Sequence, residues 1–217
     1  MADTDERLWH MRIRVNLQIF IFAIIFYLTQ QIKIYTILML FALVHELGHL
    51  LAGVCLGLKA KSIDIMPFGI SINFEDYSNK YIIKKILIAI AGPLTNLIIV
   101  IFGVYNNWDE DIIYSNALIG MFNLIPLYPL DGGRILKYII QLVSNVKEAE
   151  IMTYKLSNIL IIILTIISSI GILFMKNIGI VLILAYLWML VIKENKKYKL
   201  KMKIFKLISE NTKALQT

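Results

Sequence analysis

Six long apolar runs divide this 217-residue chain and limit what it can fold into. A helix needs roughly 20 mostly apolar residues to cross a bilayer, so six such helices occupy about 120 positions. Hydrophobic residues make up 59% of the sequence and charged residues only 17%, proportions that exclude a water-soluble globule. We therefore expect an all-α polytopic membrane protein with six transmembrane helices. The predicted spans are residues 13–28, 34–56, 82–104, 112–128, 156–175 and 178–192.

The basic residues gather on one side of these predicted spans. Of the 22 Lys and Arg residues, only Lys33 and Lys176 fall on the opposite side. Positive charge marks the cytoplasmic side of a membrane protein, so both termini are expected in the cytoplasm. The chain then consists of a membrane domain, residues 1–192, and a basic cytoplasmic tail, residues 193–217, whose lysines suit anionic lipid headgroups. Because topology accounts for the positive charge, we expect no nucleic-acid partner.

A different pattern separates the second and third spans. Between residues 58 and 79, Ile63 and Ile65 and then Ile70 and Ile72 alternate with polar or small residues, on either side of a Pro-Phe-Gly sequence. Alternation with a period of two predicts strands. We therefore expect a short β-hairpin at the membrane surface.

Ionisable residues are costly inside a membrane helix, and here they gather in one motif of the second span. His45, Glu46 and His49 form the pattern HExxH. Residues four apart share one face of a helix, so the two imidazoles are able to bind one zinc ion, with Glu46 within reach of a metal-bound water. The alternative is a pair of structural histidines bonded to neighbouring carbonyls, but it gives no reason for Glu46 in an apolar helix.

A catalytic zinc ion takes three protein ligands and keeps one open position, so the two histidines need a partner. The extended motif with a third histidine is excluded because Cys55 stands at its position, and Glu75 falls in the predicted hairpin. Asp131 remains, at the inner end of the fourth span, where prolines and glycines interrupt the helix. We predict His45, His49 and Asp131 as zinc ligands in a site that opens toward the cytoplasm, with helix capping as the alternative role of Asp131.

Together these motifs resemble the signature of the site-2 protease family, intramembrane zinc metalloproteases of peptidase family M50. That signature pairs HExxH in one span with N-x-x-P and D-G in another, here at Asn123, Pro126 and Asp131, and residues 91–96 (AGPLTN) are similar to the family's intervening span. The similarity extends to the six-span sporulation members of the family. These usually carry a cytoplasmic CBS domain, which we do not expect here because only residues 193–217 follow the last span.

The resemblance implies an activity and its partners. It implies one Zn2+ per chain, a membrane-associated protein substrate such as a sigma-factor precursor, and an inhibitory membrane partner, and it leaves the oligomeric state open. In peptide hydrolysis Glu46 acts as general base and general acid without binding the metal. Asn123 is predicted to contact the substrate carbonyl or the oxyanion, with an interhelical hydrogen bond as the alternative. The strand edge at Ile70 and Ile72 is predicted to accept an unwound substrate by strand addition. Asn96 is interpreted as a packing residue, with a functional role as the alternative.

Two other classes of function remain open from the sequence. Intramembrane histidines and carboxylates also mark ion pathways, so a zinc transporter is one alternative. A pathway needs such residues along several spans, whereas the only other histidine, His10, precedes the first one. The second alternative is a non-catalytic scaffold, which has no need of Glu46.

Overall fold

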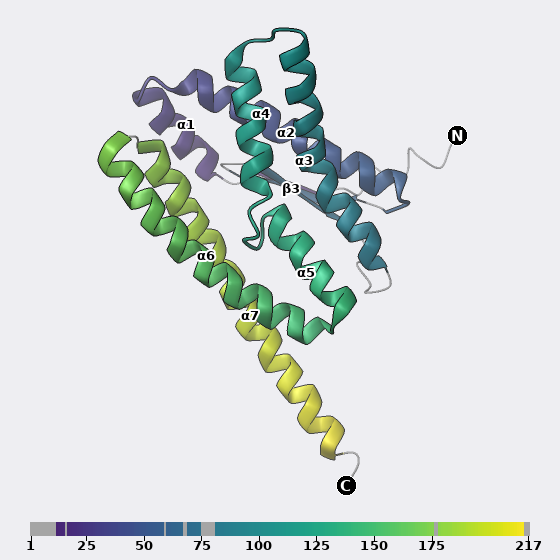
Figure 1. Cartoon of the computed structure of the whole chain (residues 1–217). Coiled ribbons are helices and arrows are strands. Elements are labelled where there is room, and N and C mark those ends of the chain that lie inside the picture. Colours follow the sequence, from purple (N-terminus) through teal and green to yellow (C-terminus); the bar gives the residue numbers. More distant parts are fainter. Residues whose placement is uncertain are drawn as a thin grey trace. The chain divides into compact units, whose positions relative to one another are not determined.

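The computed structural model describes residues 12–15, 17–58, 60–66, 69–74, 81–175 and 178–214. The chain divides into two compact units, Met1–Ile125 and Pro126–Thr217 (Figure 1). The first unit contains β1 (Arg12–Val15), α1 (Gln18–Leu28), α2 (Ile32–Cys55), β2 (Ala60–Met66), β3 (Gly69–Phe74), α3 (Ile82–Tyr105) and α4 (Glu110–Asn123). The second unit contains α5 (Asp131–Val143), α6 (Val146–Met175) and α7 (Ile178–Ala214).

A three-stranded sheet with the order β1-β2-β3 lies in the first unit. β1 pairs with β2 in parallel, and β2 pairs with β3 antiparallel, with Ile63 opposite Ile72 and Ile65 opposite Ile70. β2 and β3 fall in the segment 58–79, where the sequence alternates, and the Pro67 and Phe68 positions between them lie outside the described residues. Within the described sheet β3 is an edge strand, and it lies against α2.

The prediction of the first membrane span is wrong over its opening residues. Residues 12–15 form a strand, and the helix that follows, α1, has only 11 residues. A helix of that length is too short to cross a bilayer unaided. The physical reason is the pairing of Ile13 and Val15 with β2, a tertiary contact that overrides the local apolar pattern.

Helix α2 turns its polar and small residues inward and its large apolar residues outward. His45, Gly48 and His49 are buried, whereas the opposite face exposes a row of apolar side chains. That row consists of Leu40, Leu43, Leu47, Leu51 and Val54. A water-soluble protein has the reverse distribution, so this face suits lipid.

Three helices of the described residues are long and apolar enough to cross a membrane, judged by length and composition. They are Ile32–Cys55, Ile82–Tyr105 and Val146–Gly171. The predicted fourth span is shorter as a helix, because α4 ends at Asn123 and the chain is irregular from there to Leu130. Pro126 and Pro129 explain this break, since neither ring is compatible with a helix interior.

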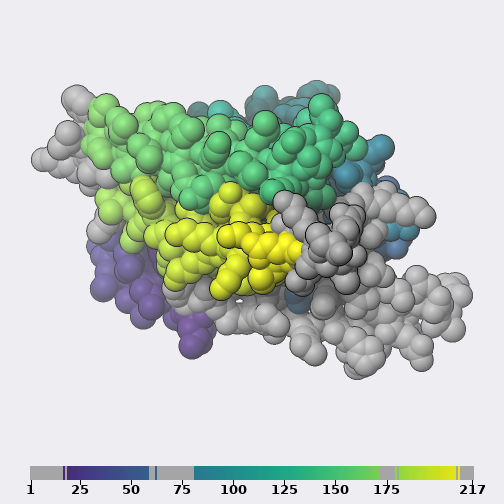
Figure 2. All heavy atoms as spheres, turned by 90° about the horizontal axis from the view of Figure 1, so that it is seen from below, coloured from purple at the N-terminus to yellow at the C-terminus, as the bar shows by residue number. Residues whose placement is uncertain are grey.

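The second unit is built on two long helices that pack side by side. α6 and α7 are in contact, and their green and yellow spheres lie next to each other in Figure 2. Asn158 and Asn195 join them through reciprocal hydrogen bonds of 3.3 and 2.8 Å between their side-chain amides. α7 continues without a break through residues 192–193, where the predicted tail begins. Helix α5 was not predicted, and Lys137 and Arg134 explain why, since they interrupt its apolar pattern.

Candidate metal centre

Helix α2 brings the two predicted histidine ligands together. Because they lie four residues apart, His45 and His49 project from one face, and both side chains are buried. Their Nε2 atoms are 3.2 Å apart, and their rings stand at 85° to each other. Two nitrogens bound to a tetrahedral zinc ion at about 2.05 Å lie about 3.3 Å apart. The spacing of the two Nε2 atoms therefore fits a shared zinc ion.

Hydrogen bonds at the far side of each ring explain why these nitrogens face one another. The Nδ1 of His49 donates to the carbonyl oxygen of Ile88 at 2.6 Å. The Nδ1 of His45 bonds to the side-chain Oδ1 of Asn96. With hydrogen on both Nδ1 atoms, each Nε2 presents a lone pair, which is the form of histidine that binds a metal. Both partners lie on α3.

Gly92 allows α3 to approach these rings closely. A Cβ atom at this position would lie 2.5 Å from the Cε1 of His49 and 2.6 Å from the Nε2 of His45. No other residue fits there without displacing an imidazole. The α3 backbone at Gly92 therefore forms one wall of the site.

Glu46 lies on the same helix, between the two histidines in sequence, and is partly buried. A carboxylate next to two imidazoles has the chemistry of a base for a metal-bound water.

Asp131 begins α5 in the second unit. It is 4% exposed, and its Oδ1 lies 3.8 Å from the Nη1 of Arg134. A carboxylate in the first turn of a helix is stabilised by the helix dipole. A Cβ at Gly133 would meet the backbone of the preceding loop, 2.5 Å from the carbonyl carbon of Leu127, so the loop folds tightly over the first turn of α5. This loop fixes the position of Asp131 within its unit.

The three predicted substrate-contacting residues lie in the first unit. Asn123 is the last residue of α4, is partly buried, and donates from Nδ2 to the carbonyl oxygen of Ile119 at 3.0 Å. Ile70 and Ile72 lie on the edge strand β3, and their side chains are outside the described part of the structure.

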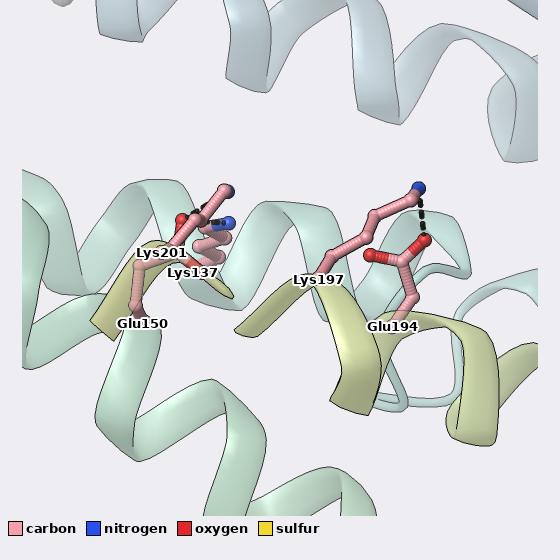
Figure 3. A network of polar contacts seen from close by, with 5 residues as sticks. All are labelled: Lys137, Glu150, Glu194, Lys197 and Lys201. Atoms are coloured by element: carbon pink, nitrogen blue, oxygen red, sulfur yellow. Dashed lines mark hydrogen bonds and ion pairs between the residues drawn. The ribbon is translucent and has the colours of Figure 1, made fainter. Parts of the chain in front are cut away.

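Sequence reasoning missed two polar features. One is Asn116, which is fully buried and bonded to Asn96. A Ser-Asn pair at 115–116 in an apolar span is the signal that could have found it. The other is the ionic network of the second unit in Figure 3, where Lys137 and Lys201 contact one oxygen of Glu150 at 2.7 and 2.6 Å. Lys201 lies 51 residues from Glu150 in the sequence, so no local pattern indicates their contact.

The chain is similar to members of a known protein family. The model for peptidase family M50 matches residues 33–106 and 111–167, more than half of the chain. Stage IV sporulation protein FB of Bacillus subtilis is 29% identical over 134 residues, which cover 58% of this chain and 46% of that protein. A putative zinc metalloprotease of Synechocystis is 36% identical over 124 residues, which cover 51% of this chain and 32% of that protein. The chain spans less than half the length of these relatives.

A solved structure gives the same result for the fold. The site-2 protease from Methanocaldococcus jannaschii superposes with a TM-score of 0.69 at 21% identity, covering 86% of this chain and 92% of the other. The fold and the HExxH helix thus define a class, the multi-pass membrane zinc metalloproteases of site-2 protease type. Within that class, the chain belongs to peptidase family M50. The resemblance predicted from the motifs is confirmed.

Proposed function

We propose that this chain is an intramembrane zinc metalloendopeptidase that hydrolyses a peptide bond in or near the membrane. The observation that carries the proposal is the pair of buried imidazoles, His45 and His49, whose Nε2 atoms converge to 3.2 Å in a chain of family M50. Two buried imidazole nitrogens at this spacing have the geometry that two ligands of one zinc ion require.

Asp131 is proposed as the third ligand, so that His45, His49 and Asp131 hold one Zn2+ per chain. Three observations support this assignment. The carboxylate is buried in its own unit, it follows the N-x-x-P sequence of the family signature, and two imidazoles with one carboxylate are a donor set that catalytic zinc uses. A carboxylate that served only as a helix cap has no need to be buried, because water stabilises it at least as well.

Different residues of the chain then have different roles in the hydrolysis. Bound zinc supplies Lewis-acid chemistry, polarising the scissile carbonyl and lowering the pKa of its water toward about 7. The Glu46 carboxylate takes the proton of the attacking water and returns it to the leaving amine. The side-chain amide of Asn123 keeps a second Nδ2 hydrogen beyond its bond to Ile119, and this hydrogen is available to a substrate carbonyl.

A membrane-associated protein is the proposed substrate class, with a sigma-factor precursor as the first example to test. Similarity to stage IV sporulation protein FB supports this choice. A helical substrate must unwind before hydrolysis, and the edge strand β3 offers backbone groups at Ile70 and Ile72 for strand addition. Replacing Ile72 with proline removes one backbone donor from this edge. We expect slower cleavage at unchanged zinc content, and unchanged turnover would refute the docking role.

We place both termini and the opening of the site on the cytoplasmic side. The distribution of basic residues supports this orientation. The ion pair between Lys33 and Asp111 at 2.7 Å agrees with the predicted topology, in which Lys33 and the loop at 106–111 share one side of the membrane, but it does not tell which side that is. An inhibitory membrane partner remains part of the proposal because the family resemblance implies one.

Co-expression of the chain with a tagged sigma-factor precursor tests the proposed activity. Glu46→Gln should keep one zinc per chain and lose cleavage, since the amide cannot accept the proton of the water. Glu110→Gln is the matched control, because Glu110 is an exposed carboxylate at the start of α4, and it should cleave like the wild type. Cleavage that survives Glu46→Gln would exclude this mechanism, and zinc movement that survives it would favour transport.

A further inference from the structure

A chain of side-chain amides connects His45 to helix α4. The His45 Nδ1 bonds to the Oδ1 of Asn96 on α3, and the Nδ2 of Asn96 donates to the Oδ1 of Asn116 on α4 at 2.9 Å. The Nδ2 of Asn116 then donates to the carbonyl oxygen of Ile112 at 2.9 Å. Both asparagines have 0% exposure. The chain thus connects three helices of the first unit, and its two amides are fully buried.

The last acceptor fixes the direction of every bond in this chain. The Ile112 carbonyl can only accept, so Asn116 must turn its NH2 group toward it and its oxygen toward Asn96. Asn96 must in turn direct its NH2 group to Asn116 and its oxygen to His45. An oxygen can only accept, so His45 must carry its hydrogen on Nδ1. A reversed amide would set two oxygens against each other where no water relieves them.

Packing alone does not explain two fully buried amides. Leucine has a similar size, and in an apolar helix it costs nothing to bury, whereas each amide must find partners for all its polar atoms. The second unit offers a comparison, since Asn158 and Asn195 bond to each other reciprocally. That pair links two helices, and within the described residues its further hydrogen bond goes to the backbone carbonyl oxygen of Tyr154. The pair in the first unit instead leads to a metal ligand.

We propose that Asn96 and Asn116 are positioning residues for the metal centre. They hold His45 in the tautomer that leaves its Nε2 lone pair for zinc, and they fix the plane of its ring. His49 needs no such side chain, because the backbone carbonyl of Ile88 does the same for it. The inference deepens the proposed function and rests on it, and it makes the position of α4 a determinant of metal affinity.

Zinc affinity of the 217-residue protein in detergent, measured by competition with a chelator, tests the inference without any substrate. Asn96→Leu should weaken zinc binding about 10- to 100-fold, as loss of a group that orients a metal ligand does. Asn116→Leu should weaken it about 3- to 10-fold, because Asn96 keeps its place but loses the group that orients it. Asn158→Leu is the matched control, because it replaces a partly buried interhelical amide whose hydrogen bonds go to Tyr154 and Asn195, and it should stay within about 2-fold of the wild type.

A rescue variant separates positioning from packing. Asn96→Asp presents an oxygen acceptor to His45 whichever way its side chain is turned, but its second oxygen then faces the Oδ1 of Asn116. Asn116→Leu removes that oxygen, so the double variant should keep zinc affinity within about 3-fold of the wild type. In the Asn96→Asp background Asn116→Leu should cost less affinity than it does alone, because the orientation at position 96 no longer matters. If Asn116→Leu weakened zinc binding equally in the wild type and in Asn96→Asp, the proposed order of donors and acceptors would be wrong.

Nitrogen NMR of 15N-histidine-labelled, zinc-free protein gives a readout that mere stability does not change. At about pH 8.5, His45 should carry its hydrogen on Nδ1 in the wild type and lose this preference in Asn96→Leu. Hydrogen on Nε2 in the wild type would overturn the inference even if a variant fails to fold. A wild type that binds no zinc would refute the proposed function instead, whereas tight zinc binding that is unchanged in Asn96→Leu would refute only the positioning role.

Discussion

The two units use opposite means to hold polar groups in an apolar environment. In the first unit, neutral amides form a directed chain that ends at a histidine, and both Asn96 and Asn116 are fully buried. In the second unit, Lys137, Glu150 and Lys201 form an ionic cluster around one carboxylate oxygen. An amide has a fixed donor and a fixed acceptor, so a chain of amides transmits direction. A cluster of charges holds its members together, but it does not fix an order of donors and acceptors. Such a cluster is therefore better suited to fastening two elements together than to orienting a distant side chain.

The three side chains of the ionic cluster differ in how much of each is exposed. The Lys137 side chain is 6% exposed and that of Glu150 12%, whereas Lys201 is 48% exposed. Lys137 also lies over the ring of Tyr128, with Nζ 4.6 Å from the ring centroid, and the backbone N–H of Tyr128 donates to Ser157 at 3.0 Å. The ionic cluster therefore ties α7 to the loop that precedes Asp131. Its two ends lie in different surroundings, one buried and one close to water.

The largest effect should come from adding a side-chain atom at Gly92, where the α3 backbone lies against the two imidazoles. Gly92→Ala places a methyl group against the rings of His45 and His49, and we expect the variant to lose stoichiometric zinc and all activity. Zinc content per chain is the measurement. Gly171→Ala is the control, since a Cβ there meets nothing within 4 Å. Full zinc in Gly92→Ala would show that the rings have another arrangement open to them.

The next effect breaks the ionic cluster. Glu150→Gln leaves the buried Lys137 ammonium without its counter-charge, and we expect a loss of about 3 kcal/mol in the free energy of unfolding. Denaturant titration in detergent measures it, with zinc content expected to stay at one per chain. A variant as stable as the wild type would mean that Tyr128 and water suffice for Lys137.

Removal of zinc should destabilise the first unit more than the second. Saturating metal at 100 times the dissociation constant stabilises the folded state by about 2.7 kcal/mol, and a chelator should abolish this gain. Amide hydrogen exchange should then speed up in α2 and α3, which carry His45, His49 and their Nδ1 partners. The paired region of α6 and α7 around Asn158 should keep its protection. Uniform loss of protection in both units would contradict the division.

The pH dependence of the ionic cluster follows from Lys201. Burial lowers the pKa of this ammonium, but hydrogen bonding and attraction to Glu150 outweigh burial and raise the pKa above its ordinary value of 10.5. A group with a raised folded-state pKa stabilises fully below its unfolded value, and the gain is lost as pH rises through the folded value. Denaturation of Lys201→Met and the wild type should therefore differ by a constant amount from pH 7 to about 9, and by less above about 10.5.

The smallest effect is expected at the exposed pair of Figure 3. Lys197 and Glu194 lie 2.5 Å apart, and the lysine side chain is 55% exposed. Water and salt screen such a pair, so Glu194→Gln should change the free energy of unfolding by less than about 1 kcal/mol. Denaturant curves compared with those of Glu150→Gln test the ranking. An equal cost for both variants would show that burial does not separate the two ion pairs.

The parts of the molecule that sequence predicts well are those whose signal is local. The pair of His45 and His49 follows from spacing on one helix, because a period of 3.6 residues leaves no other geometry. The apolar length of α2 and α3 likewise determines their character as candidate spans. Asn123 and Asp131 were found from a motif around prolines, and their roles remain predictions.

The parts that sequence misses depend on distant partners. Ile13 and Val15 belong to a strand only because β2 lies beside them. Asn116 has the same local surroundings as a tolerated polar residue of an apolar helix, and its value comes from Asn96, 20 residues away. Glu150 and Lys201 meet because α6 and α7 pack together, which no local pattern reveals.

The unbroken α7 has a mechanical consequence. At 1.5 Å per residue, its 37 residues make a rod of about 55 Å, far longer than the roughly 30 Å of a bilayer's apolar core. Its apolar first half and its lysine-rich second half must tilt and rotate together, since nothing between them acts as a joint. A force that a protein or a lipid surface applies to the C-terminal end of α7 would therefore be transmitted along the helix to Lys201 and to its ion pair with Glu150.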